Sequence, residues 1–335
     1  MKKIAWGFVL AFVAALTLSA QQPAPPAAPT FPGQAFQPGP REWAFPVITA
    51  IPPAEQGERK VPGSTKTYTP QQIDDLVNPP DWFPDSHPAA PALVTKGRGA
   101  TLACGSCHLF TGAGHPESAD ISGATVDYFV QTMLDFKTGA RKDAARMNGI
   151  AKDMTEQEIR EIAEYYSKMK PTRTTMVKEG STTPKSYVGG GRMRFLDPKA
   201  AGQTEPIGQR VIEVPQDEER VRMRDPNANV FIAYAPQGSI AKGKAFVESG
   251  GKGKSVACAT CHGDNLMGLG NVPRIAGLHP AYVGRQLFLF KDGSRNGIDA
   301  QLMKKAVAQM TDEDVVNIVA YLASRDPTKA AAGTK

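Results

Sequence analysis

Apolar positions recur with helical spacing in two widely separated parts of the chain. Each of these segments begins with a threonine followed by acidic residues, which is typical of a capped helix start. We therefore predict one helix that begins after Thr155 and another that begins after Thr311. Their apolar faces are Ile159, Ile162, Ala163 and Tyr166 in the first helix, and Val315, Ile318, Val319 and Leu322 in the second.

A further pair of apolar segments precedes these helices. One covers 126–137 and the other covers 281–291, and a glycine follows each of them closely, Gly139 and Gly293. Glycine is the usual residue just past a helix end, so we predict a helix in both segments. The same pair of helices is thus expected twice along the chain.

The repetition extends to residue identity. A shift of 154 residues, which becomes 156 after a short insertion, superposes the two parts of the chain. The matched pairs include Tyr128 with Tyr282, Phe136 with Phe290, Arg141 with Arg295, Met147 with Met303, Met154 with Met310 and Tyr165 with Tyr321. We infer two copies of one domain, at 91–170 and 238–325.

All four cysteines of the chain lie inside this repeat, in the pattern C-x-x-C-H. The first motif is Cys104, Cys107 and His108, and the second is Cys258, Cys261 and His262. This pattern is typical of c-type haem attachment. Two thiols on one helical turn can each bind a vinyl group of one haem, and the next residue, histidine, can bind the iron.

Three other uses of these cysteines are conceivable. Disulfides do not explain a histidine after each pair. A thioredoxin-like motif would follow a strand in a βαβ unit, which neither motif does. Zinc would need four ligands, and each motif supplies three. We therefore predict two covalently attached haem c groups, each with its iron.

The order of elements resembles that of the class I cytochromes c, and the tandem motifs resemble the dihaem cytochromes of the c4 type. The resemblance covers about 170 of the 335 residues. It is carried by the two motifs, by the F-K-x-G-x-R stretches that begin at Phe136 and Phe290, and by the methionine seven residues before Met154 or Met310. It implies an all-α fold of two tandem domains, a distal methionine at each iron and transfer of single electrons.

Met147 and Met303 are the candidates for the distal ligands. They match in the repeat and precede the final helix of each copy, and a thioether favours reduced iron. The alternative is that they fill gaps in the core, as most methionines do. Met154 and Met310 are the rival ligands, and we interpret them as core residues.

Three residues are expected to support the haem ligands. In the resembling family a proline carbonyl accepts a hydrogen bond from the proximal histidine, and Pro273 fits that role in the second copy. The aligned residue of the first copy is Ala119, which leaves its acceptor open. Arg141 and Arg295 are candidates for binding haem propionates, with a solvated charge at a helix end as the alternative.

The segments outside the repeat have distinct compositions. Residues 1–20 combine Lys2 and Lys3 with an apolar run, as a signal peptide does, and an uncleaved membrane anchor is the alternative. Residues 21–90 form a Pro-rich extension, and 326–335 form a tail. Residues 171–237 are expected to form a long irregular segment that contains short strands at 210–214 and 230–234.

Charge and hydropathy limit the function further. The mean hydropathy of −0.32 excludes a polytopic membrane protein. The formal net charge of +6 falls to about +2 once the signal and the haems are considered, so nucleic acid is not an expected partner. Residues 88–171 are neutral overall, whereas 238–335 carry a net +5, which could steer a partner toward the second copy.

We therefore expect an exported, periplasmic electron carrier without catalytic residues. Its partners would be redox proteins such as a dehydrogenase, a quinol-oxidising complex or a terminal oxidase. One alternative is an electron-accepting subunit of a periplasmic dehydrogenase, which the Pro-rich extension and the long middle segment favour. Another is an enzyme, a dihaem peroxidase or a thiosulfate dehydrogenase.

Overall fold

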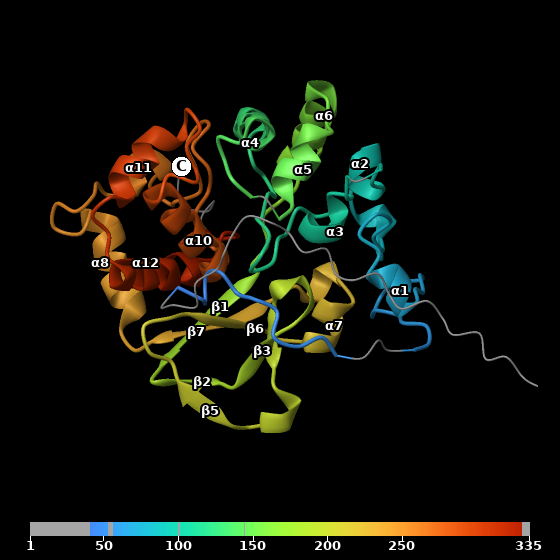
Figure 1. Ribbon diagram of the computed structural model, residues 1–335, viewed down its shortest axis with the longest axis horizontal. Helices are drawn as coiled ribbons and strands as arrows, with labels where there is room; N and C mark the ends of the chain where they lie inside the picture. The colour runs from blue at the N-terminus through green and yellow to red at the C-terminus, as the bar shows by residue number, and fades with distance from the viewer. Residues whose placement is uncertain (1–40, 53–55, 100, 144, 330–335) are drawn as a thin grey trace, which may run out of the picture. The chain divides into compact units, whose positions relative to one another are not determined.

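The computed structural model describes residues 41–52, 56–99, 101–143 and 145–329 (Figure 1). Two groups of helices carry the C-x-x-C-H motifs. The first group contains α2 (Ala92–Thr95), α3 (Gly105–His108), α4 (Val126–Thr138), α5 (Met147–Lys152) and α6 (Glu156–Ser167). The second contains α8 (Ser239–Ser249), α9 (Ala259–His262), α10 (Pro280–Lys291), α11 (Ala300–Val307) and α12 (Asp312–Ser324).

Both final helices begin as the sequence predicts. The Thr155 hydroxyl accepts a hydrogen bond from the backbone N–H of Glu158, and the Glu158 carboxylate accepts one from the backbone N–H of Thr155. Thr311 and Asp314 form the same reciprocal pair at the start of α12. These capping boxes satisfy N–H groups that have no partner inside a helix. At the end of α4, Gly139 adopts a left-handed conformation with φ of 80°, as a helix-ending glycine should.

The two final helices differ in how much of their surface is buried. Helix α6 buries one face, which includes Ile159, Ile162 and Tyr166, in a core shared with α4. Helix α12 is buried from Val315 to Ala323 without interruption. It packs against α8 and α10 and also against strands β1 (Thr175–Gly180) and β7 (Phe231–Pro236), so no long face is left for solvent.

The middle segment contains more β structure than the sequence indicates. Strand β7 pairs in parallel with β1 and antiparallel with β6 (Ile212–Pro215). Two short ladders are formed by β2 (Thr182–Pro184) with β5 (Thr204–Pro206), and by β3 (Ser186–Val188) with β4 (Arg194–Leu196). The two predicted strands are β6 and β7, displaced by one or two residues. An all-α description therefore fits the two helical groups and not the middle segment.

Short helices connect these strands. They are α7 (Glu218–Arg222), η2 (Gly190–Arg192), η3 (Pro198–Ala200) and η4 (Pro226–Ala228). The stretch of alternating charge at 217–225 contains α7, where Asp217 accepts a hydrogen bond from the Arg220 N–H. Asp225 forms an ion pair with Arg220 at 2.6 Å. Arg222 forms a second ion pair in this stretch, with Glu218 at 2.8 Å.

Residues 58–90, here called the strap, precede the first helical group. Thr69 and Gln72 form a capping box at the start of α1 (Pro70–Ile73), which is a single helical turn. The 3-10 turn η1 (Pro84–Ser86) follows. Trp82 is 3% exposed and donates its indole N–H to the Met223 carbonyl at 2.7 Å. The strap is therefore anchored to the middle segment.

Several sequence predictions concern residues outside the described ranges. They are the signal peptide at 1–20, residues 21–40 of the Pro-rich extension and residues 330–335 of the C-terminal tail. Among the residues that the structure does describe, no helix is long and apolar enough to cross a membrane.

Candidate haem sites

Both C-x-x-C-H motifs adopt one helical turn held by equivalent hydrogen bonds. The Cys104 N–H donates to the Leu93 carbonyl at 2.9 Å, and the Cys258 N–H donates to the Val247 carbonyl at 2.9 Å. All four thiols are free, and each is partly exposed. Each of the two turns therefore presents two unpaired thiols and a histidine close together.

The proximal histidines are oriented in the same way in both copies. His108 donates from Nδ1 to the Ala119 carbonyl at 2.7 Å, and His262 donates from Nδ1 to the Pro273 carbonyl at 2.7 Å. A carbonyl only accepts, so the proton is on Nδ1 and the Nε2 lone pair is left for a metal. Burial lowers the pKa of both imidazoles, which favours the neutral ligand form.

The acceptor of the first copy, left open by the sequence, is therefore Ala119. Because the acceptor is a backbone carbonyl, replacing proline with alanine does not remove it. Ser118 adds a hydroxyl 3.2 Å from His108 Nδ1, a contact that the sequence did not suggest. The side chains of Pro273 and Ala119 thus differ, while the hydrogen-bond length is the same.

The candidate distal ligands lie at the edges of two apolar cores. Met147 is the first residue of α5 and Met303 lies in α11, and both are half-buried against their cores. Met154 and Met310 are 2% and 4% exposed and lie within those cores. Their carbonyls accept from Lys137 and Lys291 respectively, a further equivalence of the repeat.

Arg141 and Arg295 face each other across the two copies. Arg141 donates to the Tyr282 hydroxyl at 3.3 Å, and Arg295 donates to the Tyr128 hydroxyl at 3.1 Å. Both guanidiniums also reach the side-chain oxygen of Gln286, at 2.8 and 3.2 Å. Burial alone would raise the pKa of Tyr128, but Arg295 and Arg141 outweigh it and lower that pKa.

This arrangement bears on the predicted propionate contacts. Within the described part of the chain, neither Arg141 nor Arg295 forms an ion pair with a carboxylate. Arg141 is buried and Arg295 is half-buried, and two adjacent cations in such a place are costly unless an anion compensates them. Haem propionates are carboxylates, so the pair fits the group that the two motifs imply.

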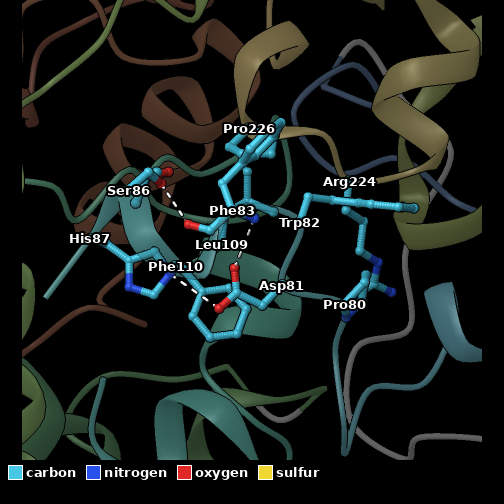
Figure 2. A pocket seen from close by; sticks show the side chains of 11 residues that line it. Pro80, Asp81, Trp82, Phe83, Ser86, His87, Leu109, Phe110, Arg224 and Pro226 are labelled. Carbon is cyan, nitrogen blue, oxygen red and sulfur yellow. Dashed lines mark hydrogen bonds and ion pairs between the residues drawn. The ribbon is translucent and has the colours of Figure 1, made fainter. Parts of the chain in front are cut away.

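The strap covers the end of the first motif. Figure 2 shows a small pocket where Asp81, Phe83 and His87 of the strap meet Leu109 and Phe110, the two residues after His108. His87 stacks on the Phe110 ring with centroids 5.2 Å apart. The strap thus packs against the first motif.

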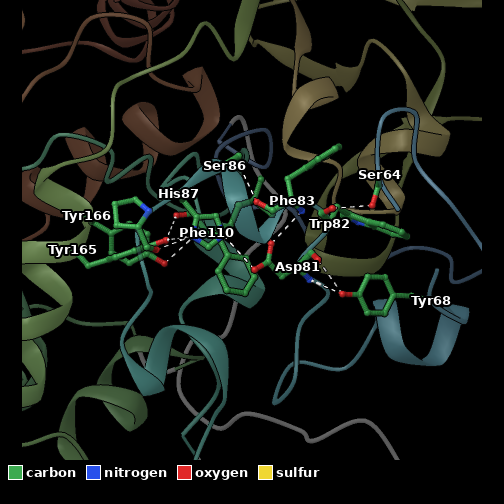
Figure 3. A network of polar contacts seen from close by, with 12 residues as sticks. Ser64, Tyr68, Asp81, Trp82, Phe83, Ser86, His87, Phe110, Tyr165 and Tyr166 are labelled. Atoms are coloured by element: carbon green, nitrogen blue, oxygen red, sulfur yellow. Dashed lines mark hydrogen bonds and ion pairs between the residues drawn. The ribbon is translucent and has the colours of Figure 1, made fainter. Parts of the chain in front are cut away.

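A polar network continues from this pocket (Figure 3). His87 contacts the Asp81 carboxylate at 3.2 Å and lies 3.2 Å from the Tyr165 hydroxyl. The Tyr68 hydroxyl donates to the Asp81 carbonyl at 2.9 Å. The strap is therefore attached to α6 through hydrogen bonds as well as through ring contacts.

Two histidines outside the motifs, His87 and His279, are involved in packing. His279 is 1% exposed and donates from Nδ1 to Glu213 of β6 at 2.9 Å. The Glu213 carboxylate also accepts the Ala281 N–H at 2.7 Å, near the start of α10. Nothing in the repeat indicated this contact, because Glu213 lies outside it.

The middle segment also touches the first motif directly. Arg224 donates to the carbonyl of Ser106, inside the motif, at 2.6 Å. Asn229 donates to the Gly114 carbonyl at 2.7 Å, in the loop that follows the motif. Sequence reasoning missed both residues, since a side chain that binds a distant backbone carbonyl leaves no local pattern.

Comparisons with known proteins agree with this geometry. Residues 240–326 match the cytochrome c family model. The thiosulfate dehydrogenase electron acceptor of Thiomonas intermedia is 28% identical over 248 residues, which cover 72% of this chain and 88% of that protein. Cytochrome c4 of Pseudomonas aeruginosa is 23% identical, with 71% of this chain and 90% of that protein covered.

A shorter relative has higher identity. Cytochrome c-554(548) of Halomonas halodenitrificans is 32% identical over 77 residues, which cover 23% of this chain and 93% of that protein. The chain belongs to the cytochrome c family. With a motif in each copy of its repeat, it is a dihaem electron-transfer cytochrome that binds haem c covalently.

Proposed function

We propose that the chain is exported to the periplasm and carries single electrons between redox partners of a respiratory chain. The observation that supports this best is the identical orientation of His108 and His262, each donating to a backbone carbonyl at 2.7 Å. Two equally prepared ligands suit two haems that both exchange electrons. Export through residues 1–20 is part of the proposal, because those residues combine Lys2 and Lys3 with an apolar run, as a signal peptide does.

When bound, each haem supplies an iron that alternates between two oxidation states. The chain's own residues fix its surroundings. Cys104 and Cys107 would hold the first haem, and Cys258 and Cys261 the second. His108 and His262 would be the proximal ligands, and Met147 and Met303 the distal ones. Arg141 and Arg295 would bind propionates near the contact between the copies.

The proposed haem domains are 91–170 and 238–325, both of class I cytochrome c type. The equivalent hydrogen bonds of the two motifs and the equivalent Lys137 and Lys291 contacts support this division. The strap and residues 171–237 would then be additions that pack on the first motif and between the domains.

A spectroelectrochemical titration of the full chain tests the proposed function. Two one-electron waves, with spectra typical of methionine-ligated haem, are the expected result. A single one-electron wave, or a high-spin spectrum from either haem, would contradict it. High-spin iron together with turnover of peroxide or thiosulfate would instead favour an enzyme.

A second candidate function is that of an electron-accepting subunit held on a periplasmic dehydrogenase. The relative from Thiomonas intermedia bears the name of such an acceptor. The strap and the middle segment add surface beyond the helical groups, which a permanent partner could use. Co-purification of the natively expressed chain with a larger subunit would support this candidate, and recovery of the chain alone would favour the mobile carrier.

A further inference from the structure

The loops that follow the two motifs meet at residues that are equivalent in the repeat. Asp120 comes directly after Ala119, the acceptor for His108, and Arg274 comes directly after Pro273, the acceptor for His262. Arg274 Nη2 lies 2.9 Å from Asp120 Oδ2, and the two side chains are 9% and 0% exposed. A buried ion pair therefore joins the two loops that orient the proximal histidines.

Each charge is fixed on its own loop by the residue two positions further on. Asp120 Oδ1 accepts hydrogen bonds from the Ser122 hydroxyl and, at 3.0 Å, from the Ser122 N–H. Arg274 Nη1 donates to the Ala276 carbonyl at 2.7 Å. Ser122 and Ala276 match in the repeat, so the two charges are held in equivalent ways. The negative charge, Asp120, belongs to the loop of the first site, and the positive charge, Arg274, belongs to the loop of the second.

The attraction between the two side chains is that of opposite charges. The 2.9 Å contact falls outside hydrogen-bond geometry, since Asp120 Oδ2 has no hydrogen-bond partner among the described residues. Because both groups are buried, salt and water screen them little. The field of such a pair therefore acts on nearby groups more strongly than that of a surface ion pair.

We infer that Asp120 and Arg274 are positioning residues that make the two haem sites electrostatically different. The inference rests on the proposed function. Oxidised iron carries one more positive charge than reduced iron. Asp120 therefore stabilises the oxidised state of the first haem, and Arg274 destabilises that of the second. The first haem then has the lower potential, and an electron on the chain resides mainly on the second.

The test is a redox titration of the full dihaem chain with the double variant Asp120→Asn/Arg274→Gln. This variant removes both charges with little change of shape, so neither partner is left as an unpaired buried ion. The reduction potential of the first haem should rise and that of the second haem should fall. The difference between the two potentials, here called the gap, should therefore become smaller. Met147→His and Met303→His backgrounds assign the waves, because each should lower one wave only.

A stronger variant exchanges the charges, as Asp120→Arg/Arg274→Asp. It keeps an ion pair but places the positive charge at the first site and the negative charge at the second. The difference between the two haem potentials should therefore become still smaller or change sign. The control is Arg41→Gln/Asp312→Asn, which removes an ion pair of 2.7 Å that involves neither loop and whose side chains are 43% and 38% exposed. It should leave the difference between the two haem potentials unchanged.

The outcomes separate the two claims. Two waves whose gap stays the same in the neutral double variant would overturn the inference, whatever happens to the melting temperature. A control that narrows the gap as much as that variant does would overturn it too. A single wave of two-electron amplitude in the unmodified chain would also overturn the inference, whereas a single wave of one-electron amplitude would overturn the proposed function.

Discussion

Arg141 and Arg295 are paired in an antiparallel β-bridge, and each binds a tyrosine of the other copy. The backbone next to the two arginines also forms reciprocal hydrogen bonds between the copies. The Lys142 N–H donates to the Ser294 carbonyl at 2.8 Å, and the Asn296 N–H donates to the Ala140 carbonyl at 2.8 Å. The two donors are equivalent in the repeat, and so are the two acceptors. The two copies thus contact each other through the same residues, as the subunits of a two-fold symmetric dimer do.

Removing one of these tyrosine hydroxyls should destabilise the chain. Tyr128→Phe or Tyr282→Phe deletes a hydrogen bond to a charged donor, a contribution of about 1.5–3 kcal/mol. The free energy of unfolding, from denaturant titration, measures the loss. Tyr234→Phe is the control, because the Tyr234 hydroxyl makes no hydrogen bond within the described part of the chain, and it should change the value by less than about 0.5 kcal/mol. Equal effects of Tyr128→Phe and Tyr234→Phe would contradict the prediction.

The distal ligands can be tested by spectroscopy. Met147→Leu and Met303→Leu should each remove about half of the near-infrared band that methionine-ligated ferric haem gives. The size of the side chain is kept, so the cost in packing should stay below about 1.5 kcal/mol. Met154→Leu and Met310→Leu are the matched controls in the core, and the band should survive in both. Loss of the band in Met154→Leu but not in Met147→Leu would show that the ligand was misassigned.

The strap should contribute substantially to stability. Trp82 packs with Val61, Ile73 and Met223 in a small core. Trp82→Ala should lower the free energy of unfolding by about 3–5 kcal/mol. Leu302→Ala, at a site 71% exposed, should change it by no more than about 0.5 kcal/mol. If Trp82→Ala were as mild as Leu302→Ala, the strap would not be part of the folded core.

One acid should make stability depend on pH below neutrality. A hydrogen bond from Arg98 and the cap of Thr155 lower the pKa of Glu158 from 4.5 to about 2. A carboxyl with a lowered pKa stabilises the fold above its unfolded pKa, and that contribution is lost as pH falls from about 4.5 to 2. In Glu158→Gln the melting temperature should fall less steeply over this range than in the unmodified chain. If the melting temperature fell equally steeply with decreasing pH in both chains, Glu158 would not be paired with a charged group.

The sequence predicted those parts of the site that depend on local pattern. The C-x-x-C-H turns, the caps at Thr155 and Thr311 and the equivalence of Arg141 with Arg295 can all be recognised from neighbouring residues or from the repeat. That the two arginines face each other could not be predicted, because a repeat does not show how its copies pack. Asp120 and Arg274 occupy equivalent positions of the repeat but differ in residue type and in charge. A comparison that looks for identical residues therefore does not reveal them.

The middle segment shows a different limit. Only Thr175 is fully buried in strand β1, and the strand includes an exposed lysine, Lys178, and a partly buried glutamate, Glu179. A strand with such a sequence has no clear apolar alternation, so it was not predicted. Its place beside β7 depends on the covering helix α12, a contact between distant parts of the chain.

The central claim is that this one chain carries two haem c groups on thioether bonds at its two motifs. The most direct test is the intact mass of the denatured chain after expression with haem-attachment machinery. The expected result is a mass increase of two haems that persists under denaturation, and of one haem when Cys104 and Cys107 are both replaced by serine. A chain with free thiols at either motif, or with haem lost on denaturation, would contradict it.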